Sequence, residues 1–136
     1  MSKRQVVITV FLTWLLGGCA VFDDRTPEER VRERAQKRVD TLMVGDFEAS
    51  YAHASPGYRS AHSLSQYQKK FGGVIMWKEA AAGDISCADP GDNGLVVKCD
   101  LEMMITYRAR GMTWDQTTAV PETWILVDGE WYLYIK

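Results

Sequence analysis

Cys87 and Cys99 are the residues whose spacing most directly predicts chemistry in this 136-residue chain. They lie on either side of the segment 90–94, Pro-Gly-Asp-Asn-Gly, whose composition is typical of a turn. If this segment closes a β-hairpin centred near Asn93, the two cysteines face each other about 4.5–5.5 Å apart at Cα, within reach of a disulfide. Such a bond would contribute about 2–3 kcal/mol. The alternative is two buried free thiols, and a metal site is disfavoured because no histidine lies nearby.

The third cysteine, Cys19, ends a segment that differs from the rest of the chain. Lys3 and Arg4 precede an apolar run over residues 6–16. This run is shorter than the roughly 20 residues that cross a bilayer and suits the apolar core of a secretory signal peptide. The sequence Leu16-Gly17-Gly18-Cys19 resembles the lipobox of bacterial lipoproteins. That resemblance implies a diacylglycerol on the Cys19 thiol and cleavage before Cys19. The alternatives are an ordinary secreted protein and a membrane-anchored helix.

Lipidation would place the protein in the bacterial cell envelope. Ala20, rather than aspartate, follows the cysteine, which in Gram-negative lipoproteins usually implies export to the outer membrane, here facing the periplasm. With Cys19 assigned to lipid, the remaining cysteines form an even pair, as expected in an oxidising compartment. We therefore expect a signal peptide over residues 1–18, a lipidated tether over 19–25 and one soluble domain over 26–136.

Catalytic signals are few. A cavity histidine could act as a general base near neutral pH, but a surface or helix-end position is commoner for His53 and His62. His53 is two residues from Tyr51, so the two cannot share a helical face. The sequence contains no nucleotide-binding loop, zinc-binding helix, serine-nucleophile turn or redox Cys-x-x-Cys. We expect a non-enzymatic protein without metal or other cofactor.

Aromatic side chains are the richest feature of the second half. They could form an apolar pocket or a partner-binding groove, or they could be core, which is the interpretation favoured for most of them. On the last predicted strand either Tyr132 and Tyr134, or Trp131 and Leu133, must face away from the core. The aromatic candidates for ligand or partner binding are Tyr51, Trp77, Tyr107, Trp124, Tyr132 and Tyr134.

Helices are predicted in the first half. Thr26-Pro27-Glu28-Glu29 has the spacing of a capping box with proline at the first helical position. Apolar residues at helical spacing then form a stripe along one face, namely Val31, Ala35, Val39, Leu42 and Met43. The opposite face is expected to be solvated and carries Arg30, Arg32, Glu33, Arg34, Lys37 and Arg38. Asp46 can cap a second helix, which Ser55-Pro56-Gly57 breaks, and Ser63 can cap a third.

Strands are predicted in the second half, where the apolar period changes to two. The expected strands cover residues 75–88, 95–110, 114–127 and 131–135, with a bulge or bend at Pro121. Asp128-Gly129 is a two-residue hairpin signal. This order predicts an α+β fold in which N-terminal helices pack on a curved antiparallel four-stranded sheet.

Several segments together resemble the NTF2-like superfamily, small cones in which a curved sheet wraps around helices. They are Val44-Gly45-Asp46-Phe47, Tyr51, Ser55-Pro56-Gly57-Tyr58, Glu122-Thr123-Trp124 and Asp128-Gly129-Glu130-Trp131-Tyr132. The first β-hairpin of full-length members has no counterpart here. Some NTF2-like enzymes, such as ketosteroid isomerase, pair an aspartate base with a tyrosine. However, Asp100 alternates away from Tyr107 and Asp46 is explained by capping, so no catalytic residue can be transferred.

Charge narrows the range of partners. The formal net charge of −2 argues against nucleic acid, which would need a clustered basic surface.

The leading hypothesis for the function is a membrane-anchored lipoprotein that binds another envelope protein as an adaptor or assembly accessory. The alternatives are a small apolar ligand bound in the cone cavity and an isomerase or dehydratase-type enzyme.

Overall fold

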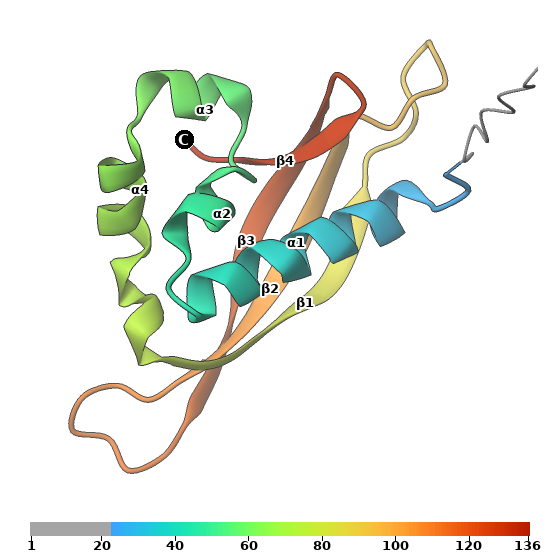
Figure 1. Cartoon of the computed structure of the whole chain (residues 1–136). Helices are drawn as coiled ribbons and strands as arrows, with labels where there is room; N and C mark the ends of the chain where they lie inside the picture. The colour runs from blue at the N-terminus through green and yellow to red at the C-terminus, as the bar shows by residue number, and fades with distance from the viewer. Residues whose placement is uncertain (1–22) are drawn as a thin grey trace, which may run out of the picture.

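The computed structural model describes residues 23–136, so the predictions for the signal peptide and for lipidation at Cys19 lie outside the described residues. Helices precede strands along the chain (Figure 1). The helical elements are α1 (Pro27–Met43), α2 (Phe47–Tyr51), α3 (Pro56–Ala61), α4 (Leu64–Phe71) and the 3-10 helix η1 (Gly72–Met76). The strands are β1 (Trp77–Cys87), β2 (Lys98–Tyr107), β3 (Gln116–Val127) and β4 (Glu130–Tyr134).

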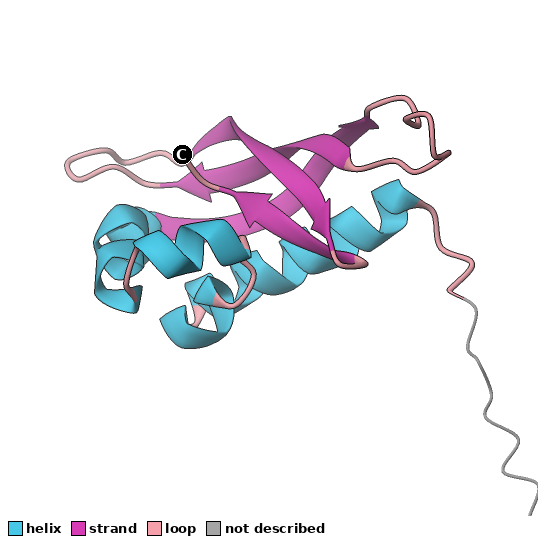
Figure 2. Ribbon diagram, turned by 90° about the horizontal axis from the view of Figure 1, so that it is seen from above, coloured by secondary structure: helices cyan, strands magenta, loops and turns pink. Residues whose placement is uncertain are grey.

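The four strands form one antiparallel sheet in the order β1-β2-β3-β4, and the helices gather on one of its faces (Figure 2). The predicted α+β class and the helix-then-meander order are therefore confirmed. No helix within residues 23–136 combines the length and the apolar character that crossing a membrane would require.

The long helix α1 forms where the capping box predicts it. The Thr26 side chain accepts a hydrogen bond from the Glu29 N–H, and the Glu29 carboxylate accepts one from the Thr26 N–H at 2.8 Å. These bonds satisfy two of the amides that a helix start leaves unpaired. Four residues of the predicted apolar stripe, Val31, Ala35, Val39 and Leu42, are fully buried, whereas the fifth, Met43, is partly buried. The first three residues of the stripe pack with the sheet in the main core.

The short helices differ from the prediction in one place. The second helix ends before Ser55-Pro56-Gly57, as predicted, but a further helix, α3, begins at this segment: Ser55 caps it and Pro56 occupies its first turn, where its missing N–H costs nothing. Tyr58 of α3 and Tyr67 of α4 then build a second core cluster with Leu42 and Ala54. At its centre the Ser50 and Tyr67 hydroxyls lie 2.7 Å apart, so both polar groups are paired inside the protein.

The sheet places alternate side chains in the main core, as the period-two pattern predicts. The buried strand residues are Cys99, Leu101, Met103, Ile105, Trp124, Trp131 and Leu133. Asp128 and Gly129 adopt φ values of 50° and 82°, the left-handed pair that a two-residue hairpin turn requires. The strands are shorter than predicted at several ends: Ile75 belongs to η1, and Trp114 lies in the loop before β3.

The 88–97 loop closes as a hairpin between β1 and β2. Cys87 and Cys99 are register partners and are joined by a disulfide, with their Cα atoms 3.9 Å apart. Because Cys99 is fully buried, this bond ties the loop end of the hairpin to the main core.

Backbone groups of both edge strands, β1 and β4, form hydrogen bonds with residues outside the sheet. On β1, Gln36 of α1 accepts from the Ala82 N–H at 3.0 Å and donates to the Ala80 carbonyl at 3.2 Å. On β4, Leu133 donates to the His53 carbonyl at 2.8 Å, and its own carbonyl accepts from the Ser55 N–H at 2.9 Å. Backbone groups that an edge strand usually leaves open are paired at these positions.

Candidate functional site

Four of the six aromatic residues predicted to bind a ligand or partner occupy packing positions. Trp124 is completely buried, and Trp77 and Tyr107 pack against the main core from partly buried positions. The Tyr107 hydroxyl donates to the Gln116 side chain at 3.1 Å. Tyr51 packs in the second cluster, where its hydroxyl donates to the Arg59 and His62 carbonyls. These four side chains therefore do not form a common open pocket.

Alternate side chains of β4 point to opposite faces of the sheet. Trp131 and Leu133 are buried in the main core, so Tyr132 and Tyr134 point the other way. The Tyr132 ring lies beneath two guanidinium groups, with the Cζ atoms of Arg34 and Arg59 at 5.4 and 5.8 Å from the ring centroid. Tyr134 keeps 47% of its surface exposed. Of the predicted binding aromatics, it is the most exposed.

Tyr134 lines an apolar groove between α3 and the C-terminal strands, which we call the α3 groove. Its volume is about 330 Å³. One wall comes from α3 and its C-terminal cap, where the Tyr58 and His62 rings stack with centroids 4.4 Å apart. The lining residues are Ser55, Pro56, Gly57, Tyr58, Ala61, His62, Ile125, Val127, Tyr134 and Ile135. Because this set contains no charged Lys, Arg, Asp or Glu side chain, the groove suits an apolar side chain of a partner.

A second groove, the Arg38 groove, lies on the other side of Tyr134 and has a volume of about 410 Å³. Its lining combines apolar and charged side chains from α1, α4, β3, β4 and the C-terminal residues. They are Arg38, Lys70, Phe71, Val120, Pro121, Glu122, Thr123, Leu133, Tyr134, Ile135 and Lys136.

A buried ion pair forms part of the lining of the Arg38 groove. Arg38 Nη1 donates to Glu122 Oε1 at 2.8 Å, and the two side chains are 2% and 9% exposed. The other Glu122 oxygen accepts from the Trp124 indole N–H at 3.0 Å. Arg38 also lies against the Phe71 ring, with its Cζ 5.0 Å from the centroid. Its Nε is buried and has no hydrogen-bond partner within residues 23–136. The guanidinium therefore retains donor capacity beside the groove.

Arg38 was expected on a solvated face, and that prediction is wrong. Arg30, Arg34 and Arg38 stand four residues apart on α1 and face the β3–β4 hairpin. Arg30 donates to the Gly129 carbonyl at 2.7 Å, and Arg34 donates to the Glu130 carboxylate at 2.9 Å. The spacing of the three arginines predicts that they share one side of the helix. It does not predict their partners, which lie 84 to 99 residues further along the chain.

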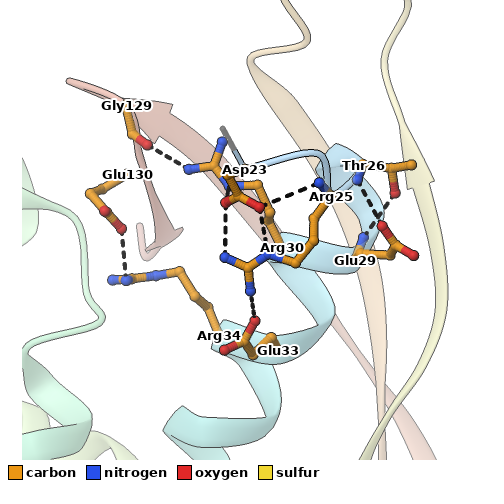
Figure 3. Close-up of polar contacts among 9 residues, drawn as sticks. All are labelled: Asp23, Arg25, Thr26, Glu29, Arg30, Glu33, Arg34, Gly129 and Glu130. Carbon is orange, nitrogen blue, oxygen red and sulfur yellow. Dashed lines mark hydrogen bonds and ion pairs between the residues drawn. The ribbon is translucent and has the colours of Figure 1, made fainter. Parts of the chain in front are cut away.

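The first described residues also join this hairpin region through charge (Figure 3). Asp23 pairs with Arg25 at 2.6 Å and with Arg30 at 3.5 Å, and Arg25 also contacts Glu33. The hydrogen bond from Arg25 is the largest reason that the pKa of Asp23 falls to about 2. This polar network holds the start of the domain against α1, beside the turn that connects β3 and β4.

His53 is buried, which contradicts the expected surface position. Its backbone pairs with β4, and its ring Nδ1 has no hydrogen-bond partner among the described residues. Burial is the main cause that lowers the pKa of His53 to about 4, and the positive charges of Arg34, Arg38 and Lys37 lower it further. The ring is therefore neutral near pH 7 and too weakly basic to serve efficiently as a general base there.

The acidic candidates stay on the polar side, as the alternation predicts. Asp100 is exposed and accepts a hydrogen bond from Thr123 at 2.7 Å, which is the largest cause of its lowered pKa. Asp46 caps α2 through the Ala49 N–H. Neither carboxylate lines either groove.

Comparisons with known proteins support the fold alone. No protein-family profile matches the sequence, and no curated protein matches it significantly. Among solved structures, the chain is similar to the solution structure of RPA3114, a SEC-C motif containing protein from Rhodopseudomonas palustris, with a TM-score of 0.54. The two share 16% sequence identity over 81% of this chain and 76% of the other. At this identity the similarity concerns the path of the backbone.

Proposed function

We propose that this chain is a non-enzymatic lipoprotein of the bacterial envelope, anchored through Cys19 in the outer membrane, that binds another envelope protein. It would act as an adaptor or assembly accessory on an NTF2-like cone. The observation that carries the binding surface is Tyr134, which is 47% exposed beside the apolar α3 groove. Large apolar surface left open in this way is a common mark of a protein-binding site.

The filled interior favours a protein partner over a ligand enclosed in the cone. Trp124, Trp131 and Met103 are at most 1% exposed and occupy the space between sheet and helices. The α3 groove is instead a surface feature that can accept a side chain from a partner. Tyr134 would supply the rigid aromatic contact that is enriched at the centre of protein interfaces.

The chemistry of the buried polar groups favours binding over catalysis. The Glu122 carboxylate is committed to Arg38 and Trp124, and a pKa of about 4 makes His53 a weak base. Enzymes that use general acid–base catalysis usually hold such groups near the working pH and within reach of substrate.

Site-specific photocrosslinking in cells tests the partner proposal. A benzophenone amino acid at Tyr134 should yield a discrete crosslinked protein, identifiable by mass spectrometry, because the groove would be covered in the complex. The same probe at Lys37, an exposed position on α1, is the matched control and should yield no such product. Equal products from both positions, or none from Tyr134 in intact envelopes, would contradict the proposal.

A separate experiment tests the anchor. Mass spectrometry of the mature protein should find its first residue to be Cys19 carrying fatty acyl chains, and Cys19→Ser should prevent lipid attachment. Two or three acyl chains hold a protein stably at a membrane, whereas one does so only marginally. A mature terminus at another residue would reject the anchor without affecting the crosslinking result.

A further inference from the structure

The Arg38 groove combines a positive end with an apolar wall. Among its lining side chains, three are cationic, Arg38, Lys70 and Lys136, and one is acidic, Glu122. Both oxygens of that carboxylate already accept hydrogen bonds from the protein. The charge balance of the lining therefore favours an anion. Thr123 and Tyr134 supply the side-chain hydroxyl groups of the lining.

Arg38 is the unusual member of this set. Its residue is 1% exposed, and a buried guanidinium normally has its donors satisfied, because an unpaired buried donor destabilises the folded state. Here the Glu122 contact uses Nη1, while Nε has no partner within residues 23–136. A guanidinium offers five donors in a planar fork that suits a carboxylate. Arg38 is thus an incompletely paired cation in the lining of the groove.

The opposite side of the groove accepts hydrocarbon. Phe71, Val120, Pro121, Leu133 and Ile135 supply apolar surface, and Val120 is 39% exposed. The volume of about 410 Å³ falls in the range of small-molecule sites, which are commonly several hundred Å³. A chain of about eight carbons fits this space, and a single charged head group would meet the cationic end.

We propose that the Arg38 groove binds an aliphatic monocarboxylate, with its head group at Arg38 and Lys70 and its chain along Phe71, Val120 and Leu133. The site is separate from the α3 groove, although both grooves share Tyr134 and Ile135. Carboxylate binding therefore does not depend on the proposed protein partner. Its affinity should be about millimolar for a ligand of roughly ten heavy atoms in an open groove.

Octanoate is the probe, with 1-octanol as the matched ligand that lacks the charge. Methyl NMR spectra of the protein in lipid-free buffer should show saturable shifts at Val120 and Leu133, which line the Arg38 groove and not the α3 groove. Octanol should bind at least about tenfold more weakly, because a hydrogen bond to a charged group contributes about 1.5–3 kcal/mol. Val44 is exposed and absent from the groove lining, so its methyl signals report any general effect of the ligand.

Substitutions of two neighbouring lysines complete the test. Replacing Arg38 would disturb Glu122, so Lys70→Ala is the informative variant and Lys69→Ala its control, since Lys69 does not line the groove. Lys70→Ala should weaken octanoate binding about two- to fivefold, and Lys69→Ala should leave it unchanged. Equal affinity for octanol and octanoate, equal losses in the two variants, or no saturable shifts at the groove methyls would each overturn the proposal.

Discussion

Replacing Arg38 by methionine should destabilise the domain far more than the loss of one ion pair at a surface would. The pair lies at 2.8 Å, and its side chains are only 2% and 9% exposed, so water from the Arg38 groove can replace the missing partner only in part. Removing one member of a buried pair typically costs about 3–5 kcal/mol, because the other charge stays buried without compensation. Methionine retains the aliphatic length that packs near Phe71, which limits the cavity contribution.

A second substitution separates charge from packing. Glu122→Gln removes the charge but keeps an oxygen that can accept from the Trp124 indole N–H. In the Arg38→Met/Glu122→Gln double variant no uncompensated charge remains, so at least about 2 kcal/mol of the loss from Arg38→Met should be recovered. The two single losses should therefore sum to clearly more than the loss in the double variant.

Urea unfolding followed by tryptophan fluorescence measures these changes. The midpoint should fall while the slope with urea stays similar, which marks a change in stability with little change in the surface exposed on unfolding. Lys37→Met, at an exposed neighbouring position, is the control and should stay within about 0.5 kcal/mol. A loss below about 1 kcal/mol in Arg38→Met, or additive losses in the double variant, would refute the reasoning.

Three further perturbations can be measured by the same unfolding assay. Reducing the Cys87–Cys99 bond, or replacing both cysteines by serine, should cost about 2–3 kcal/mol because the bond closes a short loop, and an unchanged midpoint in reductant would exclude that role. The pKa of His53 falls from 6.5 to about 4 on folding, so its contribution is fully present above pH 6.5 and is lost as the pH drops toward 4. The loss should approach about 3 kcal/mol and should be smaller in His53→Gln; an identical pH dependence in that variant would assign it to other groups. Gly83→Ala should cost about 1–3 kcal/mol, because the new Cβ would lie 2.7 Å from the Glu102 carbonyl oxygen, whereas Gly73→Ala meets no atom within 4 Å and should change little.

Features encoded by neighbouring residues were predictable from the sequence. Two examples are the capping box of Thr26 and Glu29 and the turn at Asp128-Gly129. Each depends on residues within four positions of one another, so each can be predicted before the fold is known. The register that brings Cys87 opposite Cys99 follows from the centre of the hairpin loop. The apolar stripe of α1 and the alternation along β2 likewise follow from periodicity.

Features that depend on distant partners were not predictable. Arg38 is separated from Glu122 by 84 positions, and nothing in the helix alone distinguishes it from the exposed Lys37 beside it. His53 is buried because its backbone pairs with Leu133 at the edge of the sheet. The faces of β4 could be assigned only once the position of α1 was known, since alternation alone leaves both assignments open. The candidate grooves were missed for the same reason.

The paired backbone groups at the edges of the sheet have a consequence for the protein at high local concentration. Strands with free backbone groups can recruit identical strands from neighbouring molecules, and a high local concentration would accelerate such polymerisation. Gln36 occupies the middle of β1, and the His53–Ser55 segment occupies the backbone of Leu133. Copies packed side by side can therefore remain separate molecules rather than seeds for fibrils.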